Sequence, residues 1–131
     1  MTVLLVEDDT AVRLTLANLL EDAGFDVLDA GDAEDAWALI ADPAQHIDIL
    51  VTDLNLGHGD SGLVLAANAR MHLPNLQTVY VTGSPEKFNG HPLSQWERVF
   101  FKPFDPAALI AALSGLSGMH RAQNPATLEY I

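Results

Sequence analysis

Three acidic residues of this chain stand where apolar runs end, and their type and spacing suit cation binding. Glu7 and Asp8 follow the run at residues 2–6, and Asp53 follows the run at residues 47–52. Two carboxylates about 5 Å apart repel by roughly 3 kcal/mol at an effective dielectric of about 20, so acids gathered at one place need a positive partner. Carboxylate oxygens suit Mg²⁺, Mn²⁺ or Ca²⁺, and the sequence has no cysteine and no histidine pair spaced to bind zinc.

A threonine and a lysine follow two further apolar runs. Thr82 comes after residues 76–81, and Lys102 comes after residues 98–101. A divalent ion, a lysine and a hydroxyl around one carboxylate are the groups that stabilise a phosphoryl group during transfer. Because carboxylates form aspartyl phosphates, Asp53 is the candidate nucleophile.

Five short apolar runs have the length and composition of buried strands, and a helical pattern follows most of them. We expect strands at residues 2–6, 25–30, 47–52, 76–81 and 98–101. Strands that alternate with helices form a parallel sheet covered on both faces. We therefore predict the α/β class, a doubly wound five-stranded parallel sheet in the order 2-1-3-4-5. In this order the candidate residues meet at the carboxyl ends of the strands, at the switch between strands one and three.

The helices that connect these strands show start signals of differing strength. Asp9, Asp32 and Asp105 are better explained as helix N-caps than as site residues, and a third helix is expected to begin near Ser61. The helix between strands four and five is predicted to be short or irregular, because residues 85–96 contain two prolines and a glycine. The buried stripe of the second helix is predicted to be Ala33, Ala36, Trp37 and Ile40.

Length and charge limit the classes of protein and partner. The 131 residues suit one domain, expected at residues 1–116, followed by a tail at residues 117–131 that is partly ordered at best. The formal charge of −12 argues against nucleic acid or an anionic membrane as a direct partner. The chain has no apolar run long enough for a membrane span and no signal-peptide pattern, so a cytoplasmic protein is expected.

Four short motifs, in order along the chain, resemble the receiver domains of bacterial two-component response regulators. They are LLVEDD at residues 4–9, TDLNL at residues 52–56, VTG at residues 81–83 and KPF at residues 102–104. Each motif alone is weak, but together, at the ends of predicted strands one, three, four and five, they are highly specific. The resemblance extends from Thr2 to about Leu116 and implies the flavodoxin-like receiver fold.

The resemblance implies a magnesium site and a phosphoacceptor. Asp8 would bind Mg²⁺ directly, Glu7 would help through water, and the backbone carbonyl of Asn55 would complete the protein ligands together with Asp53. Asp53 would accept the phosphoryl group. The lysine–proline step of the family, often a cis bond, is present here as KP.

The same resemblance gives roles to the threonine and the lysine. Lys102 would pair with the phosphate or, before phosphorylation, with Asp53. Thr82 would bond a phosphoryl oxygen and move inward on activation. The implied function is that of a receiver in a phosphorelay, which takes its phosphoryl group from a sensor histidine kinase or a histidine phosphotransfer protein. The resulting change in conformation would alter contacts with a downstream protein target, and the only chemistry expected is gain and loss of its own phosphoryl group.

Two departures from the family pattern leave alternatives open. The aromatic residue usually found three positions before the lysine is replaced by Val99, so a degenerate receiver that binds partners without phosphorylation remains an alternative. The loop after Asp53, LGHGDSG, is longer than usual and is similar to the loops of receivers associated with hybrid histidine kinases. A Mg²⁺-dependent phosphohydrolase of the haloacid dehalogenase type is a weaker alternative, because Asn55 stands where such enzymes carry a second acid.

Overall fold

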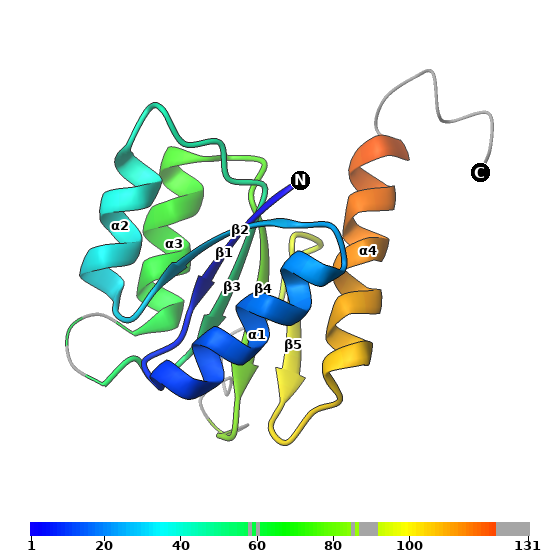
Figure 1. Ribbon diagram of the computed structural model, residues 1–131. Coiled ribbons are helices and arrows are strands. Elements are labelled where there is room, and N and C mark those ends of the chain that lie inside the picture. The colour runs from blue at the N-terminus through cyan, green and yellow to red at the C-terminus, as the bar shows by residue number, and fades with distance from the viewer. Residues whose placement is uncertain (58, 60, 85, 87–91, 123–131) are drawn as a thin grey trace.

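A five-stranded parallel sheet forms the centre of the computed structural model, which describes residues 1–57, 59, 61–84, 86 and 92–122, with only the backbone for 117–122 (Figure 1). The strand order is β2-β1-β3-β4-β5, and every neighbouring pair is parallel, which confirms the predicted topology. The strands are β1 (Thr2–Val6), β2 (Asp26–Ala30), β3 (Ile49–Asp53), β4 (Gln77–Thr82) and β5 (Glu97–Phe101).

Four helices of the described residues cover the two faces of this sheet. They are α1 (Thr10–Asp22), α2 (Ala33–Ala41), α3 (Gly62–His72) and α4 (Pro106–Ala122). Helices α2 and α3 pack together on one face, and α1 and α4 pack on the other (Figure 1). None of these helices, as far as the structure describes the chain, combines the length and the apolarity needed to cross a membrane.

The alternation of side chains along the strands produces two separate hydrophobic cores. In β1, Leu4 and Val6 belong to the core under α2 and α3, whereas Val3 and Leu5 belong to the core under α1 and α4. All four side chains are almost fully buried, as expected for a central strand of a doubly covered sheet. The strand ends, where the two cores meet the loops, are the places at which polar side chains can gather.

The predicted helix starts are confirmed by their capping contacts. The carboxylates of Asp9 and Asp32 accept hydrogen bonds from backbone N–H groups in the first turns of α1 and α2. The Ser61 hydroxyl does the same for α3, and Asp105 accepts a bond of 3.0 Å from the N–H of Ala107. These aspartates are therefore engaged in local helix capping.

The prediction that Trp37 lies in the buried stripe of α2 is wrong. Ala33, Ala36 and Ile40 are buried, but Trp37 is 40% exposed. It lies at the edge of the stripe, where its ring meets that of His72 on α3 edge to face, with the ring centroids 5.8 Å apart. The small alanine side chains let α2 approach the sheet closely. The large indole ring of Trp37 therefore lies outside the contact between the helix and the sheet.

Two sequence expectations fall partly beyond what the structure describes. The short or irregular helix predicted between β4 and β5 falls mainly on residues 85 and 87–91, which lie outside the described residues. The helix α4 continues to Ala122, past the boundary at residue 116 that the sequence suggested, and residues 123–131 of the expected tail lie outside the described residues.

Candidate functional site

The register of the sheet brings the carboxyl ends of β1, β3 and β4 to one edge. Val6 pairs with Thr52, and Asp53 pairs with Val81, so the residues that follow β1 and β4 flank Asp53. Parallel strands all end at the same edge, which is why side chains far apart in the sequence meet there. The site therefore follows from the strand order and needs no long loop to assemble it.

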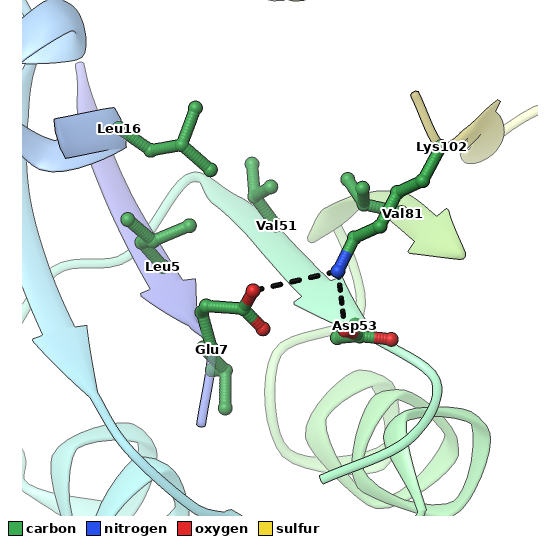
Figure 2. A pocket seen from close by; sticks show the side chains of 8 residues that line it. Leu5, Glu7, Leu16, Val51, Asp53, Val81 and Lys102 are labelled. Atoms are coloured by element: carbon green, nitrogen blue, oxygen red, sulfur yellow. Dashed lines mark hydrogen bonds and ion pairs between the residues drawn. The ribbon is translucent and has the colours of Figure 1, made fainter. Parts of the chain in front are cut away.

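Lys102 lies between two carboxylates at this edge. Its Nζ donates to Asp53 Oδ2 at 2.7 Å and contacts Glu7 Oε1 at 3.4 Å (Figure 2). The peptide bond between Lys102 and Pro103 is cis, as the resemblance implied. One ammonium group thus partly balances two negative charges that strands β1 and β3 bring together.

Three carboxylates form a group that fits a divalent cation. One oxygen from each of Glu7, Asp8 and Asp53 lies within 4.8 Å of the others. Glu7 is 4% exposed, and its Oε2 is buried without a hydrogen-bond partner in the described part of the chain. A buried carboxylate oxygen without a partner is costly, and a metal ion or its bound water would satisfy it.

The environment shifts the proton affinity of two groups in this cluster. Burial raises the pKa of the Glu7 carboxyl to about 7; the nearby Asp53 charge raises it too, and the Lys102 charge opposes them. Burial lowers the pKa of the Lys102 ammonium, but the hydrogen bond and charge of Asp53, with those of Glu7, outweigh this and raise it. Lys102 is therefore a cation at neutral pH, whereas the Glu7 carboxyl is then near the midpoint of its protonation.

Apolar side chains form the inner wall of the site. Leu5, Leu16, Val51 and Val81 line the space beside the ammonium of Lys102 (Figure 2). This wall keeps water away from one side of the ion pairs, which strengthens the electrostatic interactions among them. The carboxylate of Asp53 keeps partial exposure on the opposite side, with a side chain 12% exposed.

Two glycines suit the backbone that follows β3, beside the carboxylates. Gly57 has φ +76°, and a Cβ there would lie 3.6 Å from Asp8 Oδ2. A Cβ on Gly62 would overlap the backbone carbonyl of Asp53, so this first residue of α3 has no room for a side chain. The backbone N–H of Asn55 donates to Asp53 Oδ1 at 3.1 Å, which fixes the second oxygen of that carboxylate.

Thr82 lies beside this group but contacts other atoms. Its side chain is buried, and its Oγ1 accepts a hydrogen bond of 3.0 Å from the N–H of Ser84. Its backbone carbonyl accepts from the N–H of Lys102 at 2.7 Å, which ties the end of β4 to the lysine. Glu7, Asp8, Asp53 and Lys102 are therefore brought together directly, while Thr82 is placed at the adjacent strand end.

One residue of this region is missed by the sequence reasoning. Arg13 of α1 donates from Nη1 to the backbone carbonyl of Glu7 at 2.7 Å and from Nε to Asp29 Oδ2 at 3.0 Å. Its only signal in the sequence is a position one helical turn after the acidic residues. Such a position also suits an ordinary surface arginine.

Comparisons with known proteins agree with this geometry. The family model described as "response regulator receiver domain" matches residues 3–114. A curated relative is the phyllosphere-induced regulator PhyR of Methylorubrum extorquens, 26% identical over 112 residues, covering 86% of this chain and 42% of PhyR. The chain spans about half or less of the length of the curated relatives it matches.

Solved structures of receiver domains have the same fold. A response regulator receiver protein from Sinorhizobium medicae superposes with a TM-score of 0.80 at 29% identity, covering 88% of this chain and 93% of that one. The receiver domain of the hybrid histidine kinase CckA superposes with a TM-score of 0.75 at 29% identity, covering 88% and 97%.

Proposed function

This chain belongs to the response regulator receiver domain family, and we propose that it accepts a phosphoryl group from a phosphohistidine onto Asp53. The observation that carries the proposal is the contact of Lys102 with both Asp53 and Glu7 at the ends of β3 and β1. A carboxylate at the mouth of the site, with a fixed cation beside it, is what in-line transfer of a phosphoryl group needs.

Mg²⁺ is the proposed cofactor, held by Asp8, Glu7, Asp53 and the backbone carbonyl of Asn55. The clustered carboxylate oxygens and the unpartnered Oε2 of Glu7 support this assignment. When bound, Mg²⁺ supplies positive charge that offsets the developing charge on the phosphoryl oxygens.

The transfer itself makes one bond and breaks one. A carboxylate oxygen of Asp53 forms a bond to phosphorus as the bond from phosphorus to the donor imidazole breaks. The leaving imidazole nitrogen takes up a proton from the solvent, and Asp53 becomes an acyl phosphate. Before transfer, Lys102 neutralises Asp53 through the contact at 2.7 Å; after transfer, the same ammonium pairs with a phosphoryl oxygen.

Thr82 is the proposed residue that reports phosphorylation. Its Oγ1 acts as an acceptor toward Ser84, so the hydroxyl can still donate to a phosphoryl oxygen. A donation of this kind would draw the end of β4 inward and bias the loop that follows it. A change of this kind alters the surface offered to a downstream protein.

The proposed donors are a sensor histidine kinase or a histidine phosphotransfer protein, and the proposed place is the cytoplasm. The likeness to the receiver of a hybrid histidine kinase supports a place in a phosphorelay. A separate phosphohydrolase activity is not favoured, because position 55 is an asparagine, whose side chain is not an acid, where such an enzyme carries a second acid.

Intact-mass measurement after incubation with acetyl phosphate and Mg²⁺ tests the proposal. The wild type should gain about 80 Da, the mass of one phosphoryl group, and lose this gain when EDTA is present. Asp53→Asn should gain nothing, whereas Asp35→Asn, a control at an exposed acid on α2, should behave like the wild type.

Two results would contradict it. A mass gain that survives in Asp53→Asn would mean that another residue is the acceptor. No gain from either acetyl phosphate or a phosphorylated histidine kinase would favour a degenerate receiver that acts without phosphorylation.

A further inference from the structure

We propose that Arg13 is a positioning residue that orients the peptide group between Glu7 and Asp8 and thereby sets the affinity of the acidic cluster for a divalent cation. The inference rests on the proposed metal site. It concerns a side chain that touches none of the carboxylate oxygens of that site in the described contacts.

The contacts of Arg13 join three segments of the fold. Its guanidinium donates to the carbonyl oxygen of Glu7 at 2.7 Å and to Asp29 Oδ2 on β2 at 3.0 Å. Its side chain is only 17% exposed, so the group is held in place and partly shielded from water. A hydrogen bond of this length to a charged donor is among the stronger ones in proteins.

The backbone at Glu7 is fixed from two directions. The N–H of Glu7 donates to the carbonyl of Ala30 at 3.1 Å, which continues the β1–β2 pairing by one residue. The carbonyl of Glu7 accepts a hydrogen bond from Nη1 of Arg13 at 2.7 Å. Because the peptide unit is planar, holding this carbonyl fixes the plane from which the side chain of Asp8 projects.

Gly31 lies directly beside this guanidinium. A Cβ at this position would lie 2.9 Å from Nη1 of Arg13, closer than side-chain atoms normally approach. Gly31 is not one of the described glycines with positive φ, so its backbone conformation does not demand glycine. The space that its missing side chain leaves is occupied by the guanidinium.

A simpler role, in which Arg13 only ties α1 to β2, predicts a different result. Asp29 is 43% exposed, and an ion pair with such a partner contributes little to stability. A tie between helix and sheet would change the free energy of unfolding without changing metal affinity. A positioning role changes metal affinity in protein that remains folded, as partners of metal ligands do in other sites.

The test compares Mg²⁺ affinity and stability in matched variants of the full chain. Isothermal titration with Mg²⁺ should show that Arg13→Met weakens binding on the order of tenfold. Arg13→Lys keeps the charge but reaches only one of the two acceptors. Its affinity for Mg²⁺ should lie between those of the wild type and Arg13→Met. Gly31→Ala, which keeps every polar group and displaces the guanidinium, should weaken binding in the same direction.

The control is Arg98→Met, which removes the same charge at the start of β5, far along the strands from the site. It should bind Mg²⁺ like the wild type. Urea unfolding of each variant gives the folded fraction, so that a loss of affinity in folded protein is separated from simple unfolding. If Arg13→Met fails to fold, Arg13→Lys and Gly31→Ala decide the question.

The outcomes separate this inference from the proposed function. If the wild type binds Mg²⁺ and Asp8→Ala abolishes binding, but the Arg13 and Gly31 variants match the wild type, the positioning role is overturned and the metal site stands. If affinity falls only in step with the folded fraction, Arg13 is a structural tie. If the wild type shows no saturable Mg²⁺ binding, the proposed metal site fails, and this inference with it.

Discussion

At the scale of single residues, Glu7 is the group whose charge state the site controls most strongly. Its carboxylate is buried, contacts Lys102 through one oxygen and leaves the other without a partner in the described chain. A carboxyl in such a position binds a proton more tightly when the protein is folded than when it is unfolded. The metal-free site therefore carries a stability cost that depends on pH.

That cost predicts the direction of a pH effect. The pKa of Glu7 is about 7 in the folded chain against 4.5 for the free side chain, so between these values the folded state holds more protons. The contribution of Glu7 to stability is therefore highest below pH 4.5 and declines as pH rises toward 7. The loss is at most about 3.5 kcal/mol, because one pKa unit corresponds to about 1.4 kcal/mol.

Urea unfolding in EDTA at about pH 5 and about pH 8 measures this loss. Acidic side chains elsewhere also affect stability in this pH range. The informative quantity is therefore the free energy of unfolding of the wild type minus that of Glu7→Gln. That difference should become less favourable to the wild type as pH rises. The same pH dependence in both proteins would show that Glu7 does not titrate as its surroundings indicate.

At the scale of secondary-structure elements, a buried polar network ties α3, β4 and β5 together. The hydroxyl of Tyr80 donates to Glu97 Oε2 at 2.6 Å, and Arg70 pairs with Glu97 Oε1 at 3.1 Å. Tyr80 pairs with Val99 across the β4–β5 register, and both side chains belong to the core under α2 and α3. The aromatic ring at this level of the sheet is thus supplied by β4, beside the valine that replaces the usual aromatic residue on β5.

Removing the hydroxyl of Tyr80 should cost stability without affecting phosphorylation. Tyr80→Phe takes a donor away from a buried carboxylate, and a hydrogen bond to a charged group contributes roughly 1.5–3 kcal/mol. Chemical denaturation should show a loss of about 2 kcal/mol, while the yield of phosphorylated protein with acetyl phosphate stays at the wild-type level. A large fall in that yield in folded Tyr80→Phe would mean that the network acts on the site as well as on the fold.

Prediction from the sequence succeeded for the strands and their order, but it missed several contacts between elements, such as those of Arg13 and Arg70. Each strand is an apolar run, and the polar residue directly after it is readable without a structure, so Glu7, Asp8, Asp53, Thr82 and Lys102 could all be chosen. Arg70 and Glu97 pair across elements 27 positions apart, and no local pattern records such a pair. Trp37 was misplaced because helical spacing gives a face but not how closely that face approaches the sheet.

At the scale of the whole molecule, Mg²⁺ binding and folding are expected to be linked. The acidic cluster joins β1 and β3, two central strands of the sheet, so the site exists only in the folded chain. A ligand that binds only the folded state stabilises it, by about 2.7 kcal/mol when its concentration is one hundred times the dissociation constant. The chain carries a formal charge of −12, so simple screening by salt must be separated from this effect.

Thermal unfolding with Mg²⁺, against NaCl at matched ionic strength, makes that separation. The wild type should unfold at a higher temperature with Mg²⁺ than with NaCl, whereas Asp8→Ala should respond equally to both salts. Asp9→Ala is the matched control, because Asp9 caps α1 and is not in the cluster. It should lose about 1 kcal/mol of stability and keep the specific response to Mg²⁺. An equal rise in the unfolding temperature of the wild type with the two salts would contradict a specific Mg²⁺ site.

The measurement that tests the central claim most directly is to locate the phosphoryl group by borohydride reduction. Borohydride converts an aspartyl phosphate to homoserine, and tandem mass spectrometry of the digested protein identifies the reduced residue. After treatment with acetyl phosphate and Mg²⁺, reduction should occur at Asp53 and should disappear when EDTA replaces Mg²⁺. Reduction at Asp8, at Asp9 or at an acid outside the cluster, with Asp53 intact, would contradict the assignment of Asp53 as the phosphoacceptor.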